Sequence, residues 1–275
     1  MRRTLLLASV CLLMLCLFQA SCEKRTVGPV VTDWDAVKEI VSRYPSVFRL
    51  GFFGTEPDTE SFYREITSSY ADIEEGELFN AEPDYIILTW GDSLLGKLHY
   101  DSSGQSHEKP IVFKARTRAY FERLGTINDP DLGWLLRRIS GTIMNSPAET
   151  TQAILELRVA SEALDTVIWE SRMKDLFGID STLVFGKEKQ VTFVVEPADT
   201  TDSLFLHVRE GEAYQKIPFV RVGEETFSAS WTTTDSPEPG RHYYHAIVDL
   251  VSQESLAADS TEYEFKAWGI VYRIK

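Results

Sequence analysis

The spacing of apolar residues changes along this chain from a helical period to a strand period. A first helix is indicated by apolar residues that recur every three or four positions: Trp34, Val37, Ile40, Val41 and Tyr44. Thr32 and Asp35 have the spacing of a capping box at its start, and Pro45 ends the run. A second amphipathic helix is predicted after Pro57, with a buried side made of Phe62, Ile66, Tyr70 and Ile73.

From residue 84 the period becomes two, which is typical of strands that are buried on one side. Strands are predicted over residues 85–89 and 94–100, on either side of a turn at Gly91 and Asp92. A long strand over 111–124 and a return strand over 133–143 are separated by a turn at 128–131. In the long strand, one face carries Phe113, Ala115, Thr117, Ala119 and Phe121, and the other carries Lys114, Arg116, Arg118, Tyr120 and Glu122.

After residue 147 the sequence consists of short apolar segments between turn-forming residues. Eight strands are predicted, over 154–159, 166–169, 190–195, 203–208, 215–220, 226–231, 242–251 and 263–274. This number and spacing of strands resembles a β-sandwich of the immunoglobulin type, although no cysteine pair is present. We therefore expect an all-β sandwich over residues 148–275.

Helices followed by long antiparallel strands indicate an α+β domain over residues 32–147. The stretch Arg118-Ala119-Tyr120-Phe121-Glu122, followed by Gly133-Trp134-Leu135-Leu136-Arg137, resembles the final hairpin of the cystatin-like and NTF2-like group. The resemblance implies a curved sheet that wraps a helix into a cone. It further implies a pocket in the cone, for which Trp90, Asp92, Tyr120 and Trp134 are the candidate lining.

The first 22 residues resemble a bacterial lipoprotein signal. Arg2 and Arg3 precede an apolar run from Leu5 to Phe18, and Ala20-Ser21-Cys22 ends it, with Gln19 where a leucine-like residue is expected. The resemblance implies a cleaved leader over 1–21, lipid on Cys22, a tether over 22–31 and a place in the bacterial cell envelope, on the periplasmic or outer-membrane face if the host is Gram-negative. An ordinary secreted protein and an uncleaved anchor are the alternatives.

The net charge and the positions of the cysteines exclude several classes of partner and of active site. The formal charge is −14, and loss of Arg2 and Arg3 with the leader makes it −16, so nucleic acid is not expected as a partner. All three cysteines lie within the first 22 residues, so the body of the protein has no disulfide, thiol nucleophile or cysteine metal site. No cofactor motif is present. His242 and His245, three apart in a predicted strand, point to opposite faces, and no metal site is predicted.

Two charged regions stand out in the N-terminal half. Residues 55–84 contain ten acidic residues and one arginine, a net charge of −9, whereas 109–138 contain seven basic and three acidic residues, a net charge of +4. The basic face of Lys114, Arg116 and Arg118 either pairs internally with the acidic region, the interpretation we favour, or docks an acidic partner or anionic ligand.

No nucleophile or metal constellation is visible in the sequence. We therefore expect a membrane-anchored envelope lipoprotein with a non-enzymatic binding or scaffolding role, whose partners are the membrane, through lipid on Cys22, and an unknown envelope protein or small ligand. The alternative is a small-ligand carrier or enzyme that uses the conical pocket. The resemblance implies Asp92, His99 and Arg137 as its acid–base set, whereas Asp92 read alone is a turn-capping residue.

Overall fold

The computed structural model describes residues 31–50, 52–55, 62–102, 104–147, 152–209, 214–234, 243–257 and 260–275. Strands make up 59% of the structure and helices 13%, with three short α-helices among the described residues. The α+β class predicted for the N-terminal domain is therefore wrong: the architecture is mostly β, built on large antiparallel sheets.

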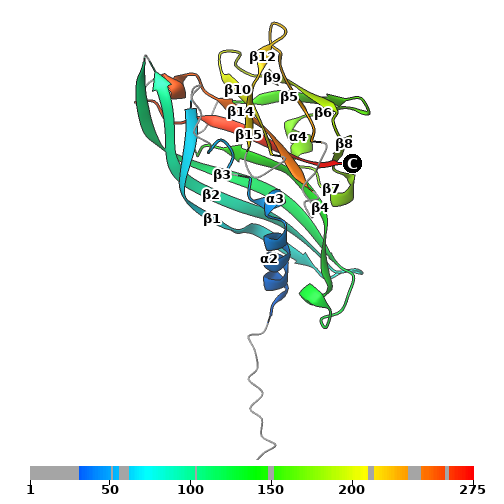
Figure 1. The fold of residues 1–275 in the computed structure, drawn as a ribbon. Helices are drawn as coiled ribbons and strands as arrows, with labels where there is room; N and C mark the ends of the chain where they lie inside the picture. The colour runs from blue at the N-terminus through cyan, green and yellow to red at the C-terminus, as the bar shows by residue number, and fades with distance from the viewer. Residues whose placement is uncertain are drawn as a thin grey trace, which may run out of the picture.

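The helices are α2 (Asp33–Arg43), α3 (Pro45–Phe48) and α4 (Glu170–Met173), with 3-10 turns η1 (Pro130–Gly133), η2 (Ile179–Ser181) and η3 (Glu254–Leu256). The strands are β1 (Phe62–Phe79), β2 (Tyr85–Ser102), β3 (Gln105–Arg123), β4 (Trp134–Asn145), β5 (Ile154–Ser161), β6 (Leu164–Ile168), β7 (Phe177–Gly178), β8 (Leu183–Phe185), β9 (Gln190–Pro197), β10 (Ser203–Arg209), β11 (Gln215–Pro218), β12 (Val220–Arg221), β13 (Phe227–Thr232), β14 (Tyr244–Val251) and β15 (Phe265–Ile274). They form two sheets (Figure 1).

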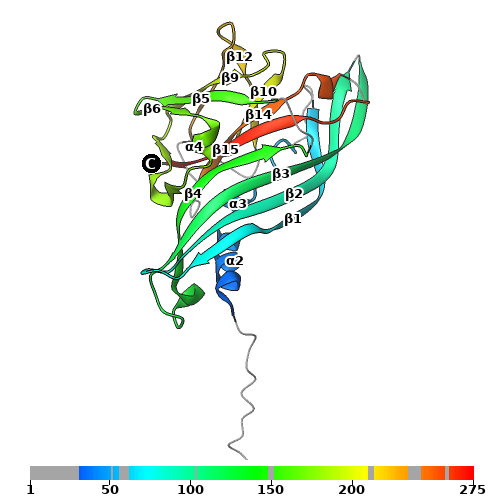
Figure 2. The ribbon, with the colours of Figure 1, turned by 180° about the vertical axis from the view of Figure 1, so that it is seen from behind.

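The ten-stranded sheet has the order β1-β2-β3-β4-β15-β14-β10-β11, with β7 beside β4 and β8 beside β15. The second sheet has the order β12-β13-β9-β5-β6 and lies over the C-terminal strands of the first (Figure 2). The long strands β1–β4 extend beyond it as a curved wing, with α2 on the inner side of the wing (Figure 1).

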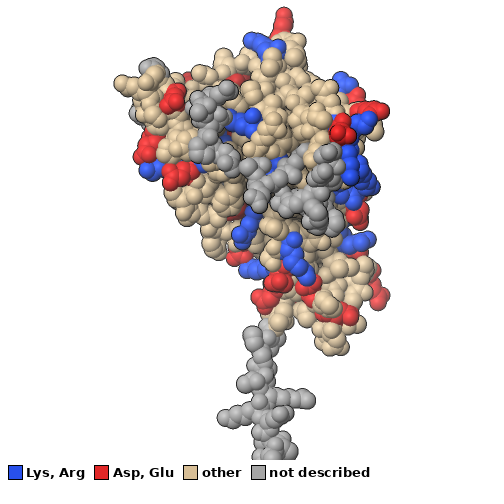
Figure 3. Space-filling model, viewed as in Figure 1, with Lys and Arg blue, Asp and Glu red and all other residues tan. Residues whose placement is uncertain are grey.

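The predicted first helix is confirmed as α2. The Thr32 hydroxyl accepts a hydrogen bond from the Asp35 amide at 3.2 Å, and the Asp35 carboxylate accepts one from the Thr32 amide at 2.9 Å, which completes the capping box. Lys38 pairs with Asp72 of β1 at 2.7 Å. Figure 3 shows basic and acidic side chains close together in the lower part of the molecule, where α2 lies in Figure 1.

The predicted second helix is wrong, because residues 62–79 form strand β1. The spacing of four between Phe62, Ile66 and Tyr70 fits a helix, but because it is an even number it also fits one face of a strand. A register shift against β2 between Ile66 and Ser68 then turns the later residues to the other face. Tyr70, predicted to be buried, is 69% exposed. Pairing with β2 along the whole strand outweighs the local helical pattern.

The turn predicted at Gly91 and Asp92 is also wrong, because β2 is continuous through both residues. Gly91 pairs with Arg116 of β3. The Glu74 side chain occupies the space that a Cβ on Gly91 would take, and its Oε2 accepts a hydrogen bond from Arg116 Nε at 2.6 Å. The glycine therefore gives Glu74 a path across the sheet rather than a turn.

The predicted β3–β4 hairpin is confirmed, and the two faces of β3 alternate as the sequence indicates. The eight strands predicted after residue 147 each overlap an observed strand. They do not form a sheet system separate from the wing, since Met144 of β4 pairs with Ala267 of β15. The strands on both sides of residue 147 thus share one sheet, and the boundary there stays a prediction.

Strands β14 and β15 lie at the centre of the molecule. All eight residues of β14 are buried, because one face meets the second sheet and the other meets α3 and the segment around Phe53. Three apolar clusters result: one between the sheets, one under α2 and α3, and one at the far end of the wing.

Candidate functional site

Three of the four predicted pocket residues lie on the inner side of the wing. Trp90 and Trp134 belong to the apolar cluster under α2 and α3, where the Trp90 ring is 6.2 Å from the ring of Phe48. The Trp134 indole donates a hydrogen bond to Asp33 of α2 at 3.0 Å. These tryptophans are thus core residues that attach α2 to the sheet.

Asp92 is the exception within this apolar surrounding. Its side chain is on the same face as Trp90 and only 1% exposed, and neither carboxylate oxygen has a hydrogen-bond partner among the described residues. Burial raises the pKa of Asp92 to about 6, against a smaller opposing effect of Arg49. The predicted turn-capping role is therefore wrong, and Asp92 is a carboxyl group that the fold favours in its neutral form.

The acid–base set implied by the resemblance is not assembled. His99 stacks on Tyr63 with ring centroids 4.5 Å apart, and its Nε2 is 2.9 Å from Glu65. Arg137 pairs with Glu122 at 3.3 Å. Tyr120, the fourth predicted pocket residue, stacks on Tyr85 on the outer side of the wing. His99, Arg137 and Tyr120 therefore do not reach Asp92 on the inner side.

A fully buried ionic network, not predicted from the sequence, ties the wing to the centre of the molecule. Arg64 of β1 and Asp249 of β14 are 0% exposed, and two guanidinium nitrogens of Arg64 each lie 2.9 Å from a carboxylate oxygen of Asp249. Arg64 Nε donates to the Tyr263 hydroxyl at 2.7 Å, and His207 Nε2 lies 3.1 Å from Asp249. The Arg64 guanidinium also lies 4.5 Å from the Phe53 ring.

The protonation states in this network follow from its geometry. Burial alone would raise the pKa of Asp249, but Arg64 and His207 outweigh it and hold that pKa below its ordinary value. Burial lowers the pKa of His207 and outweighs the attraction of Asp249, so the imidazole is neutral at pH 7 and donates its Nε2 hydrogen to Asp249. The network is closed from solvent, which makes it a structural feature rather than a binding site.

The predicted basic face lies on the outer side of β3, and its three residues have different interaction partners. Arg116 bonds Glu74 at 2.6 Å, and Lys114 is 3.9 Å from the same carboxylate. The acidic region therefore neutralises these two internally, as the favoured interpretation expects. Arg118 Nη1 donates to the Lys174 carbonyl at 3.2 Å and has no carboxylate partner among the described residues.

Arg118 faces a groove between the wing and α4, here called the outer groove. It has a volume of about 490 Å³ and is lined by charged residues of both signs, among them Glu74, Arg118 and Lys266. Glu170 accepts hydrogen bonds from Lys266 at 2.9 Å and Lys174 at 3.1 Å, and the bond from Lys266 is the largest cause of its lowered pKa. Among the described residues that line the groove, Arg118 is thus a cation without a carboxylate partner.

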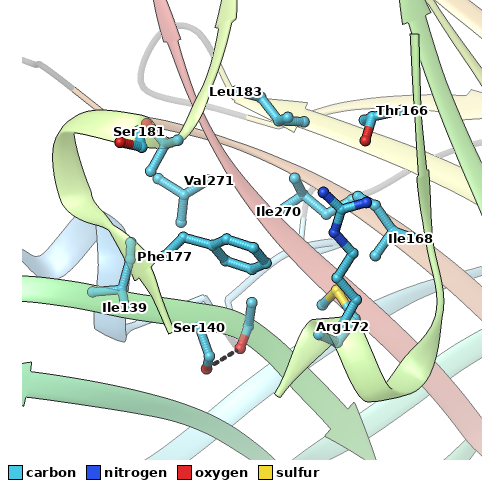
Figure 4. A pocket seen from close by; sticks show the side chains of 13 residues that line it. Ile139, Ser140, Thr166, Ile168, Arg172, Phe177, Ser181, Leu183, Ile270 and Val271 are labelled. Atoms are coloured by element: carbon cyan, nitrogen blue, oxygen red, sulfur yellow. Dashed lines mark hydrogen bonds between the residues drawn. The ribbon is translucent and has the colours of Figure 1, made fainter. Parts of the chain in front are cut away.

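A second cavity, here called the α4 pocket, adjoins the outer groove (Figure 4). It has a volume of about 130 Å³ and its wall is mostly apolar, with Ile139, Ile168, Phe177 and Ile270 among its lining. An apolar cavity of about 150 Å³ accommodates a benzene molecule, so the α4 pocket has room for a group of about six carbons. The pocket lies where β4 and β15 meet β6, α4, β7 and β8, which bring its wall together from distant parts of the sequence.

Arg172 places a positive charge in this apolar wall. Its Nη1 donates to the Val167 carbonyl at 2.8 Å, and its guanidinium lies 6.0 Å from the Phe177 ring, which reaches into the pocket in Figure 4. Among the described residues no carboxylate lies within ion-pair distance of Arg172. The side chain is half-buried. A half-buried guanidinium without a carboxylate beside an apolar cavity favours an organic anion.

Sequence reasoning missed the α4 pocket and the buried network for the same reason. Each is assembled from residues far apart in the chain, as with the 185 positions between Arg64 and Asp249. The available signal was a charged residue inside an apolar strand, such as Asp249 within residues 244–251 or His207 within 203–209. For Arg172 the sequence carries no comparable signal.

Comparison with protein-family models, with curated proteins and with solved structures finds no match to this chain. Within the ranges that the structure describes, no helix is long and apolar enough to cross a membrane. The same residues contain no cluster of three or more His, Cys, Asp or Glu side chains suited to a metal ion. Cys22 and His242 lie outside the described residues.

Proposed function

We propose that this protein is a non-enzymatic binding protein of the bacterial cell envelope that takes a small organic anion into the α4 pocket. The observation that carries the proposal is Arg172, a cation without a carboxylate partner among the described residues, in the wall of an apolar cavity of about 130 Å³. An anionic group on Arg172 and an apolar group against Phe177 satisfy both features of the site at once.

Binding is favoured over catalysis by the position of the titratable groups. Asp92, the carboxyl with the perturbed pKa on the inner side of the wing, is 1% exposed and does not line the α4 pocket. The lining of the pocket includes hydroxyl groups, such as those of Thr166 and Thr182. These groups donate and accept hydrogen bonds and suit the recognition of an anion.

The location of the protein is proposed from the leader alone. Lipid on Cys22 would hold the folded body at the membrane, since acyl chains bind at roughly 0.8 kcal/mol for each buried methylene. The acidic body, with a net charge of −16 without Arg2 and Arg3, has no electrostatic attraction to anionic lipid.

Octanoate serves as a probe of the α4 pocket because it joins a carboxylate to a short apolar chain. We expect the full chain carrying Cys22→Ser, which cannot receive lipid, to bind octanoate in a calorimetric titration. Arg172→Gln should weaken this binding by about 10- to 100-fold, because a charge-assisted hydrogen bond contributes about 1.5–3 kcal/mol. Arg172→Lys should retain part of the affinity.

The matched control is Arg221→Gln, which removes the same charge from β12 at a site where the guanidinium contacts the Gly223 carbonyl. It should leave octanoate binding unchanged. If octanoate does not bind, or if both glutamine variants weaken it equally, the α4 pocket is not the binding site.

Lipidation is tested separately in a bacterial host. Growth with an alkyne-labelled palmitate should label the wild-type chain, and Cys22→Ser should abolish the label and release the protein from the membrane fraction. Label that persists in the Cys22→Ser variant would contradict the lipoprotein assignment. A protein that stays on the membrane without label would indicate an uncleaved anchor instead.

A further inference from the structure

The α4 pocket and the outer groove are neighbouring compartments. Ser140, Gly141 and Met173 line both of them. The Met173 side chain occupies the space that a Cβ on Gly141 would fill, so the divide between the compartments is a glycine backbone and a thioether. Methionine is flexible and adapts to a neighbouring ligand more readily than branched side chains. A chain bound in the pocket can therefore continue past Met173 into the groove.

Each compartment contains one guanidinium without a carboxylate partner among the described residues. Arg172 belongs to the pocket, and Arg118 belongs to the groove. Arg118 is next to the divide, because its backbone amide donates to the Ser140 hydroxyl at 2.8 Å and its Nη1 donates to the Lys174 carbonyl at 3.2 Å. The two uncompensated cations thus lie on either side of Met173.

We propose that the ligand is a linear dianion: two anionic groups joined by an apolar segment of about six carbons, one group on Arg172 and the other on Arg118. The proposal rests on the proposed function, since it extends the ligand of the α4 pocket. The apolar segment matches the volume of the pocket, about 130 Å³. An α,ω-dicarboxylate is the simplest molecule of this class.

The alternative within the same pocket is an anion with a longer apolar tail. Such a tail would enter the outer groove, where the side chains of Glu74, Arg116, Glu170 and Lys266 are charged. An apolar group gains little among charged side chains that remain solvated, and it would leave Arg118 without a counter-ion. A second anionic group pairs with Arg118 and keeps its other oxygens in water.

Suberate and octanoate test this inference, because they have eight carbons each and differ in the second carboxylate. In the full chain carrying Cys22→Ser, at pH 7.5, we expect suberate to bind about tenfold more tightly than octanoate. Arg118→Gln should remove this advantage and leave octanoate binding unchanged, whereas Arg172→Gln should weaken both ligands. Arg118→Lys should restore part of the advantage of suberate.

The outcomes separate the two proposals. If octanoate binds through Arg172 but suberate binds no more tightly, the dianion is wrong and the proposed function stands. The dianion is equally overturned if Arg118→Gln weakens both ligands alike. If neither ligand binds to the wild-type pocket, the proposed function itself fails. Circular dichroism of each variant, compared with Arg221→Gln, establishes that a loss of binding is not a loss of fold.

Discussion

Replacing Asp249 with leucine is expected to lower the free energy of unfolding by about 3–5 kcal/mol. The substitution leaves Arg64 charged at a site that is 0% exposed, with the Tyr263 hydroxyl as the remaining hydrogen-bond acceptor of its side chain among the described residues. The guanidinium cannot lose its proton, because its pKa stays far above neutrality in any surrounding. The loss of stability is therefore the cost of burying a charge without a counter-ion. This cost is larger than the stabilisation that the aromatic rings around Arg64 provide.

Urea unfolding measured by fluorescence gives the free energies for this prediction. Asp249→Asn, which keeps the shape of the side chain, should destabilise in the same direction and covers the case in which the leucine variant does not fold. The double variant Arg64→Met with Asp249→Leu should recover most of the loss, because neither charge then remains.

The matched control is Asp165→Leu, which breaks the exposed pair with Arg158 and should leave the urea midpoint almost unchanged. An Asp249→Leu variant as stable as this control would show that the buried network does not hold β1 to β14.

Asp92→Asn is expected to stabilise the protein, by about 2–3 kcal/mol at pH 8. The reason is the buried carboxylate: burial raises the pKa of Asp92 from 3.8 to about 6, and at 1.36 kcal/mol for each tenfold change in proton affinity this corresponds to roughly 3 kcal/mol. Asparagine removes the charge and keeps the shape.

The sign of the pH dependence follows from the raised pKa in the folded state. Below about pH 4 the carboxyl is protonated in both states, and the penalty is absent. Between about pH 4 and pH 6 the unfolded chain releases its proton first, so the stability of the wild type falls as the pH rises. Above about pH 6 the full penalty remains.

The measurement is the difference in unfolding free energy between Asp92→Asn and wild type at several pH values. This difference should be near zero at pH 4 and reach its full size above pH 6. Taking the difference cancels other titrating groups, including Asp202, whose pKa burial also raises to about 6. A difference that is constant with pH, or that favours the wild type at pH 8, would contradict the raised pKa of Asp92 in the folded state.

The sequence predicted local structure well wherever one local signal dominated. The capping box at Thr32 and Asp35 defined α2, and the strict alternation from Phe113 to Phe121 defined both faces of β3. In β3 the basic side chains alternate with apolar ones, and this period of two residues fits a strand but not a helix.

The two local errors have a common physical cause. In β1, apolar residues four positions apart fit a helix as well as one face of a strand paired with β2, and in β2, Gly91 makes room for Glu74 instead of forming a turn. Both features depend on the neighbouring strand, which the local sequence does not reveal. The α+β class is wrong for the same reason, because its prediction depended on the second helix.

The candidate site depended even more on contacts between distant segments. Of the four residues predicted to line a pocket, Trp90, Asp92 and Trp134 share one side of the sheet, but that side is filled by α2, α3 and their apolar neighbours. Tyr120 lies on the other side. Arg118 was selected for its charge, and its importance arises from the α4 segment, which lies 56 positions later in the chain. The α4 pocket gathers six segments between residues 139 and 271, so no local pattern could indicate it.

A crystal structure of the protein with octanoate would show directly whether the α4 pocket binds an organic anion. We expect electron density for the ligand in the α4 pocket, with its carboxylate within hydrogen-bond distance of the Arg172 guanidinium and its chain against Phe177. A crystal in which octanoate binds elsewhere, or in which the pocket stays empty at saturating octanoate, would contradict this expectation.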